Sequence, residues 1–317
     1  MQVYEGLNEV QVPGEGRVVA IGVFDGVHLG HQSIIRETVE AARDLGVRPA
    51  VVTFDPHPEA VIKGGRGPRL LTTRGQKASL LSDLGIADML VVRFDREFAR
   101  LTPAEFCDSV LSERLGVKTV LVGEGFRFGR DGAGTAAELH RLGATHGFTT
   151  RAVPLVARDG GAVSSTRIRG LLSVGEVKGA ASLLGRPYRI DGEVSAGKGR
   201  GRSLGAPTAN IHIPSRTARP RLGVYVTRAT VDGRATYAAV TSVGTNPTFE
   251  EGGVVRAETF LLDFNGDVSG SFLSVDFLER LRGQRKFPDA NTLSRQIVKD
   301  IDAARRVHES GHAGSRN

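Results

Sequence analysis

Two histidines lie three residues apart in the segment 21–31, IGVFDGVHLGH. The apolar run 17–24 predicts a buried strand of a parallel sheet, and an apolar stripe in 31–45 predicts a helix. A helix that begins at the carboxyl end of a strand offers free N–H groups and a partial positive charge to phosphate. His28 and His31 can face one ligand there and stabilise charge that builds on phosphate oxygens. The segment therefore predicts a nucleotide-phosphate site suited to transfer of an AMP-like group.

Two other interpretations of these histidines remain open. A lone histidine more often caps a helix or packs in the core, but Gly26 and Gly30 also open the backbone for close approach of a ligand. A metal site that includes Asp55 and His57 is the weaker alternative, because histidines at this spacing usually bind metal together with further clustered ligands.

Two further segments bring groups that suit ATP. Residues 164–169, SSTRIR, combine hydroxyls with two guanidinium groups at a predicted helix start, which fits the β- and γ-phosphates. Alone, that pattern is also ordinary N-capping. Residues 55–58, DPHP, place two prolines after the predicted strand 50–54, which indicates a rigid loop or a plain strand-ending turn.

A glycine-rich basic segment, 197–210, lies in the second half of the chain and reads GKGRGRSLGAPTAN. It is not a Walker A loop, because no Ser or Thr follows the lysine and no helix is predicted after it. Backbone N–H groups of such a segment can form an anion-binding nest. Thr208 and Asn210 supply oxygen ligands suited to Mg²⁺ bound to ATP. A mobile basic loop accounts for the glycines, but it leaves PTAN unexplained.

The elements that position these groups form two patterns. Strands and helices alternate up to about residue 155, which predicts an open, mostly parallel sheet with helices on both faces. After a junction at 185–188, strand-like runs separated by turn signals predict a small antiparallel barrel, closed by a helix at 291–307. We therefore predict domains at 1–185 and 186–309 and a disordered tail at 310–317.

The composition limits the function classes. The 317 residues carry a net charge of +7, but the arginines are scattered and few aromatic residues accompany them, which favours anionic small molecules over nucleic acid. No apolar run is long enough to span a membrane, and the N-terminus does not read as a signal peptide. The single cysteine, Cys107, fits a buried apolar role. We expect a cytoplasmic protein.

The motifs together resemble a known family. Segments 21–31 and 164–169 look like the signature pair of the HIGH-type nucleotidyltransferase superfamily. In the second half, G-x-x-x-G-R-x-L-G-x-P-T-A-N, G-V-Y, G-T-N-P-T-F and E-T-x-L-L-D resemble the riboflavin kinase module. Over almost its whole length the chain is similar to the bacterial bifunctional riboflavin kinase/FMN adenylyltransferases, also called FAD synthetases.

The resemblance implies an α/β fold, in which a Rossmann-like nucleotidyltransferase domain precedes a small antiparallel β-barrel kinase domain with a C-terminal helix. It implies that the barrel phosphorylates riboflavin to FMN with ATP, and that the first domain adenylylates FMN to FAD and releases pyrophosphate. The expected ligands are riboflavin, FMN, FAD, ATP, ADP and Mg²⁺, without nucleic acid or membrane, and the expected state is a monomer or weak homo-oligomer.

The resemblance also assigns residues. Glu258 matches the catalytic base of the kinase, and Thr208 and Asn210 match the ligands of Mg–ATP. His28, His31 and Arg169 would stabilise the transition state of adenylyl transfer. The implied binding residues are Gly22, Phe24, Asp25, Gly26, Gly30, Pro56, His57, Pro58, Gly123, Phe126, Phe128, Ser164, Ser165, Thr166, Gly197, Lys198, Gly199, Gly201, Arg202, Pro207 and Asn246.

Three positions depart from the family pattern. Gly125 stands where the family usually has Asn or Asp, Ser269 precedes Gly270 in place of Tyr, and Ala257 replaces Val beside Glu258. Gly125 keeps one alternative open, a paralogue with an active kinase and a weakened or altered-acceptor transferase. A non-catalytic flavin-binding protein is a further alternative.

Overall fold

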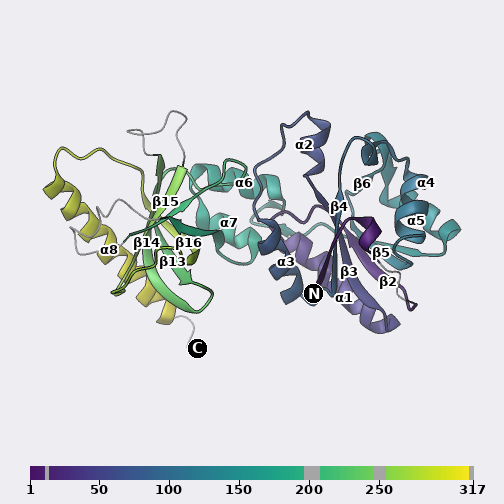
Figure 1. The fold of residues 1–317 in the computed structure, drawn as a ribbon, viewed down its shortest axis with the longest axis horizontal. Helices are drawn as coiled ribbons and strands as arrows, with labels where there is room; N and C mark the ends of the chain where they lie inside the picture. Colours follow the sequence, from purple (N-terminus) through teal and green to yellow (C-terminus); the bar gives the residue numbers. More distant parts are fainter. Residues whose placement is uncertain (11–13, 196–207, 246–254, 314–317) are drawn as a thin grey trace. The chain divides into compact units, whose positions relative to one another are not determined.

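The computed structural model describes residues 1–10, 14–195, 208–245 and 255–313 (Figure 1). The chain divides into two compact units, Met1–Ser165 and Thr166–Asn317.

The first unit is built on a six-stranded sheet with the order β1-β4-β3-β2-β5-β8. All neighbouring strands are parallel. From β2 the chain passes to β3 and β4 on one side and then to β5 on the other, so the order reverses between β2 and β5. Ligands of open α/β sheets bind at the carboxyl ends of the strands at such a reversal. The strands are β1 (Gln2–Glu5), β2 (Arg17–Ile21), β3 (Arg48–Asp55), β4 (Asp88–Arg93), β5 (Val117–Gly123) and β8 (Thr149–Val153).

Helices cover both faces of this sheet, as the sequence predicts (Figure 1). Alternate strand residues explain this: Val18 and Ala20 pack with residues of α1 and α3, whereas Val19 and Ile21 pack with residues of α4 and α5. The helices are α1 (Leu29–Leu45), α2 (Pro58–Ile62), α3 (Arg74–Asp83), α4 (Pro103–Phe106), which continues as a π-helix (Cys107–Ser112), and α5 (Ala136–His146). Short elements are 3-10 turns at Leu7–Glu9, Phe98–Arg100 and Arg130–Gly132 and the strands β6 (Arg127–Phe128), β7 (Gly134–Thr135), β9 (Ala157–Arg158) and β10 (Gly161–Ala162).

The second unit is a closed antiparallel barrel with the order β11-β12-β15-β14-β13-β16. Figure 1 shows its strands in green, with the yellow helix α8 beside them, and α8 contacts β14 and β13. The predicted barrel and closing helix are thus confirmed. The elements are α6 (Ser165–Val174), α7 (Val177–Leu184), β11 (Tyr188–Ser195), β12 (Thr208–His212), β13 (Gly223–Val231), β14 (Ala235–Thr245), β15 (Val255–Leu261), β16 (Phe272–Arg282) and α8 (Ala290–Ala313).

Three buried threonines join neighbouring strands inside the barrel. The hydroxyl of Thr241 lies 2.8 Å from that of Thr227 and 3.0 Å from that of Thr259. All three side chains are fully buried, and the hydroxyls satisfy one another across β13, β14 and β15. The row therefore places polar contacts of defined geometry inside an otherwise apolar barrel.

The structure bears on two predicted boundaries, the start of the C-terminal tail and the junction between the two domains. Residues 310–313 are helical, so the prediction of a disordered tail from 310 is wrong there; residues 314–317 lie outside the described part of the chain. Each residue added to a helix forms a further backbone bond, and the Ser310 hydroxyl donates to the Val307 carbonyl at 3.0 Å. Helix α7, which we placed in the first domain, contacts β16 and β11 of the barrel.

Candidate active sites

His28 and His31 lie together where β2 leads into α1. His28 is the N-cap of α1, and its Nδ1 accepts a hydrogen bond from the His31 backbone N–H at 3.3 Å. The two imidazole rings are stacked, with centroids 3.6 Å apart and planes 15° apart. The capping interpretation thus holds for His28, and the same cap brings the two rings together as the spacing predicts.

His31 is held uncharged by its surroundings. Burial lowers the pKa of this imidazole well below 6.5, and the positive charges of His28 and Lys77 lower it further. Its Nδ1 is enclosed and has no hydrogen-bond partner among the described residues. The Phe24 and His31 rings meet edge to face, with centroids 5.2 Å apart, so Phe24 covers one side of the imidazole. A neutral imidazole retains one N–H to donate to a phosphate oxygen.

The backbone between β2 and α1 adopts conformations that side chains seldom take. Phe24 and Val27 have φ of 51° and 40°, and Gly26 between them has φ of 85°. A positive φ at a β-branched residue such as Val27 is strained, and such strain persists only where the surroundings hold it.

Residues before α3 hold this loop. Asp25 Oδ1 accepts the backbone N–H groups of Leu71 at 2.8 Å and Thr72 at 3.2 Å. In return, Thr72 Oγ1 accepts the backbone N–H of Gly26 at 3.1 Å. Asp25, predicted to bind ligand, therefore also fixes the loop. The sequence analysis missed Leu71 and Thr72, although Thr73 and Gln76 form a capping box that marks the helix start.

The two outer glycines of the loop lie against aromatic rings. A Cβ at Gly22 would lie 3.1 Å from the Phe24 ring, and one at Gly30 would lie 3.3 Å from the His28 ring. Both positions therefore admit little more than hydrogen while the rings keep their places.

The SSTRIR segment contributes one observed contact to this site. Ser165 Oγ donates to the Asp25 carbonyl at 2.9 Å, so the end of the first unit reaches the loop. Ser164 precedes it, and Thr166 and Arg169 follow in α6 within the second unit. The interpretation of 164–169 as an N-cap alone does not explain the contact with Asp25.

The DPHP segment forms a tight connection after β3. The Asp55–Pro56 bond is cis, His57 caps α2 by accepting the Glu59 N–H at 3.2 Å, and Pro58 begins the helix. Among the described residues, no group of three or more His, Cys, Asp or Glu side chains is arranged to hold a metal ion. The capping role of His57 fits the strand-ending turn.

A cavity of about 460 Å³ adjoins the phosphate loop, and six phenylalanines are among the residues that line it. Phe126 and Phe128 stack at 5.6 Å, and Phe128 meets Phe106 at 5.6 Å. Gly123, predicted with them, ends β5. The lining residues are Gly22, Val23, Phe54, Pro58, Ile62, Phe94, Phe98, Ala99, Leu101, Phe106, Gly125, Phe126, Arg127, Phe128, Gly129 and Gly132.

Sequence reasoning missed part of this cavity. Phe54, Phe94 and Phe98 form a chain of ring contacts with centroids 5.6–6.1 Å apart. Phe54 lies near the end of β3, and Phe94 follows β4 directly. Phe-Asp recurs at the carboxyl ends of two neighbouring parallel strands, and this was a signal in the sequence for aromatic residues gathered at one sheet edge.

The predicted kinase residues lie on neighbouring strands of the barrel. Asn210 on β12 is the direct partner of Glu258 on β15, and Thr208 is the partner of Phe260. Side chains alternate along a strand, so Thr208, Asn210 and Glu258 share the outer face, while Ala209 and Ala257 are buried inside. Directly opposed residues have Cβ atoms about 4.5–5.5 Å apart. Glu258 is exposed, and Ser242 on β14 is its partner on the other side.

Seven other predicted residues lie outside the described part of the chain, and they complete the predicted set: Gly197, Lys198, Gly199, Gly201, Arg202, Pro207 and Asn246.

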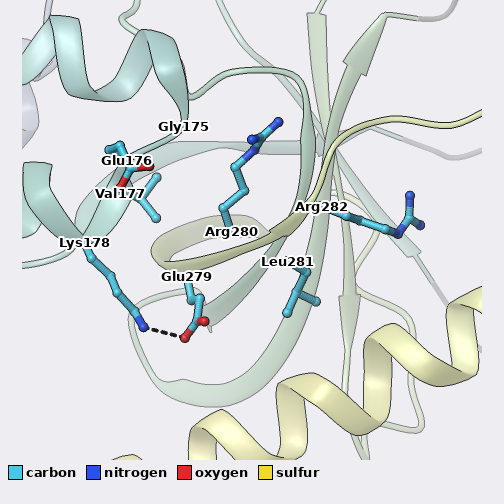
Figure 2. Close-up of a pocket in the computed structure, with 8 residues that line it drawn as sticks. All are labelled: Gly175, Glu176, Val177, Lys178, Glu279, Arg280, Leu281 and Arg282. Carbon is cyan, nitrogen blue, oxygen red and sulfur yellow. Dashed lines mark ion pairs between the residues drawn. The ribbon is translucent and has the colours of Figure 1, made fainter.

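A smaller cavity of about 290 Å³ lies between the α6–α7 turn and the end of β16 (Figure 2). Lys178 and Glu279 form an ion pair at 2.7 Å across it. Arg280 passes so close to Gly175 that a Cβ there would lie 2.6 Å from its Cδ, and its guanidinium donates to the Leu222 carbonyl at 3.4 Å. These contacts join α7 to the barrel, and none of the predicted site residues lines the cavity.

Comparison with known proteins decides the family. A model described as FAD synthetase matches residues 11–167, and one described as riboflavin kinase matches 184–308. The chain is 37% identical to a bifunctional riboflavin kinase/FMN adenylyltransferase of Pseudomonas fluorescens, over 96% of this chain and 97% of the relative. The chain belongs to this family. Relatives of the same description include those of Bacillus subtilis, 37% identical over 90% of this chain and 91% of theirs, and Escherichia coli K12, 34% identical over 96% and 97%.

A crystal structure from Streptococcus pneumoniae that bears the name macrolide-efflux protein has the same overall architecture. Its TM-score is 0.86 at 32% identity, and the match covers 96% of this chain and 99% of that one. In the described part of this chain, no helix is both long and apolar enough to cross a membrane.

Proposed function

We propose that the two activities of this riboflavin kinase/FMN adenylyltransferase lie in separate units: FMN is formed at Thr208, Asn210 and Glu258, and FAD is formed at the loop that carries His28 and His31. The adjacency of Asn210 and Glu258 across β12 and β15 carries this proposal. It sets a carboxylate beside oxygen groups suited to a metal–nucleotide complex on one rigid ladder.

In the kinase step, the Glu258 carboxylate accepts the proton of the riboflavin 5′-hydroxyl. The hydroxyl oxygen then bonds to the γ-phosphorus of ATP, and the bond to the ADP oxygen breaks. The hydroxyl of Thr208 and the amide oxygen of Asn210 are hard donors on one face and fit Mg²⁺. Bound there, Mg²⁺ would neutralise phosphate charge. ATP donates its γ-phosphoryl group in this step and an adenylyl group in the second step.

In the second step, an FMN phosphate oxygen bonds to the α-phosphorus of ATP, and pyrophosphate leaves. The FMN phosphate is already a nucleophile, so no protein base is needed. His28 and His31 supply hydrogen bonds to the charge that develops, and the N-terminus of α1 supplies partial positive charge. Ser165, whose hydroxyl donates to the Asp25 carbonyl, completes the phosphate contacts in this proposal.

The aromatic cavity of the first unit suits the flavin ring of FMN. Its volume of about 460 Å³ falls within the range of small-molecule pockets, and stacked rings such as Phe126 and Phe128 match an aromatic ligand. The cavity reaches Gly22, which begins the phosphate loop, so ring and phosphate sites are continuous. We assign 1–185 to the transferase and 186–309 to the kinase, in a cytoplasmic monomer or weak homo-oligomer.

The test separates the two steps. Purified protein is incubated with riboflavin, ATP and Mg²⁺, and FMN and FAD are resolved by chromatography. The wild type forms both. Because a general base contributes about 10²- to 10⁴-fold, Glu258→Gln lowers FMN formation by that factor but still converts supplied FMN to FAD. Glu193→Gln, an exposed glutamate on β11, is the matched control and retains both activities.

Three outcomes contradict the proposal. FMN without FAD from the wild type removes the second activity and favours the altered-acceptor paralogue that Gly125 suggests. No flavin product at all favours a flavin-binding protein. Equal loss of both steps in Glu258→Gln removes the assignment of separate sites.

A further inference from the structure

Lys77 on α3 joins the carboxyl ends of two strands beneath the phosphate loop. Its Nζ donates to the Val23 carbonyl at 2.7 Å and to Thr53 Oγ1 at 3.2 Å. Thr53 Oγ1 in turn donates to the same Val23 carbonyl at 2.9 Å. One ammonium group thus fixes the backbone after β2 and the end of β3 together.

The Val23 carbonyl directly precedes the strained part of the loop. Phe24 follows it with φ of 51°, and the loop then passes through Asp25 to His28. Asp25 is held by the backbone before α3, and Lys77 lies one turn into that helix. The segment 71–77 therefore holds the loop from both sides of Phe24, by its backbone at Asp25 and by the Lys77 side chain at Val23.

The charge of Lys77 also acts on His31. The groups that act on the His31 imidazole are the His28 ring stacked on it, the Phe24 ring against its edge, and Lys77, whose positive charge lowers the pKa of His31. Burial lowers the pKa of Lys77, the negative charges of Asp25 and Asp55 raise it, and Arg74 lowers it. The positive charge of Lys77 opposes protonation of the His31 imidazole.

We propose that Lys77 is a positioning residue for adenylyl transfer, which holds the loop after β2 in its strained conformation and whose charge acts on the His31 imidazole. This inference rests on the proposed adenylyltransferase site. A lysine that served only to satisfy a carbonyl would affect stability and leave the titration of His31 unchanged.

Three substitutions separate the hydrogen bonds from the charge. Lys77→Met removes both, Lys77→Gln keeps an N–H donor without charge, and Lys77→Arg keeps donor and charge. Lys118→Met is the matched control, because Lys118 is an exposed lysine of the same unit near the amino end of β5, away from the carboxyl edge. Each protein is assayed for FAD formation from FMN and ATP, for FMN formation from riboflavin, and for the pKa of His31 by NMR, with His31→Gln to assign the signal.

A misplaced catalytic group can lower rate by about 10²-fold, so we expect kcat for FAD formation to fall by about 10²-fold in Lys77→Met. Lys77→Arg restores most of it. The His31 pKa rises in Lys77→Met and Lys77→Gln but not in Lys77→Arg, and the pH dependence of kcat moves with it. FMN formation stays unchanged in all variants, which shows that the second unit is intact, and the NMR signal of His31 reports on the fold of the first unit.

Two results overturn the inference. One is a Lys77→Met protein, active as a kinase, whose FAD formation stays within twofold of the wild type. The other is an unchanged His31 pKa in Lys77→Gln, which decides the matter even if Lys77→Met does not fold. A wild type that forms no FAD refutes the proposed function instead, and the two failures are therefore distinguishable.

Discussion

Gly125 lies at the aromatic cavity with open space where a side chain would begin. An ideal Cβ at this position meets nothing within 4 Å, whereas one at Gly129 would lie 2.8 Å from Pro103. The Phe126 N–H bonds to the Gly123 carbonyl at 2.9 Å, which closes a turn around Gly125 without a positive φ. A larger residue therefore introduces neither a clash nor backbone strain.

We predict that Gly125→Asn strengthens FMN binding. Gly125 is exposed, so one added hydrogen bond to FMN is worth about 0.5–1.5 kcal/mol. That range corresponds to roughly 2- to 12-fold in affinity. The KM for FMN in the FAD-forming reaction should fall within that range, measured with saturating ATP. The KM for riboflavin in the kinase reaction should not change.

Gly125→Ala is the control that separates the amide from the effect of losing a glycine. It stabilises the chain by about 0.4–1 kcal/mol through the unfolded state, and it should leave the KM for FMN within about twofold. An equal fall in KM for Ala and Asn would show that loop rigidity, not a new contact, is responsible. An unchanged KM in Gly125→Asn refutes the reasoning that this position faces the acceptor.

Two further predictions concern the first unit. Asp88 is fully buried and accepts hydrogen bonds from Arg17 at 3.2 Å and from Arg48 at 2.9 and 2.5 Å. Asp88→Asn should therefore lower the free energy of unfolding, measured in urea, by about 3–5 kcal/mol. A loss below about 1 kcal/mol would contradict this. Burial raises the pKa of Asp88, but the hydrogen bonds and charges of Arg48 and Arg17 outweigh this effect and lower the pKa below 3.8. The stability that these contacts contribute is therefore present above pH 3.8 and is lost as the pH falls through the lowered pKa. Asp88→Asn should flatten this dependence of stability on pH. Burial raises the pKa of the Cys107 thiol to about 12. The native protein should therefore not react with a thiol reagent at pH 8, whereas the protein in denaturant should react fully. Rapid reaction of the native protein would contradict the burial of Cys107.

Much of the fold was predictable because the signals are local. The apolar run 17–24 predicted β2, the strand at 50–54 predicted β3, and the alternation of strands and helices up to about residue 155 predicted the parallel sheet. Strands β1, β11 and β12 were missed. Strand β1 lies at the sheet edge with three of its four residues exposed, and Gly192 interrupts the pattern of β11. Their strand form depends on neighbours that pair with them from far along the chain.

The candidate sites also combine features that the sequence predicts with features that depend on distant parts of the chain. Spacing predicted that His28 and His31 meet, because one helix start carries both. The contacts that hold the loop were not predictable, because they join residues 46 to 54 positions apart, as with Leu71 and Asp25 or Lys77 and Val23. The adjacency of Asn210 and Glu258 depends on strand register, which the sequence analysis did not assign.

The threonine row inside the barrel bears on that register. Thr241 and Thr259 are direct partners in β14 and β15, and Thr259 is the chain neighbour of Glu258. A slip of β15 by one residue would turn Thr259 outward and Glu258 into the apolar interior. The slip would remove the contact of the Thr241 hydroxyl with Thr259, although the contact with Thr227 would remain. It would also bury a carboxylate in the apolar interior, at a large penalty. The three buried threonines thus help to set the strand register that places Glu258 and Asn210 side by side on the outer face. A single-residue insertion in β15 would therefore abolish kinase activity without altering any residue of the site.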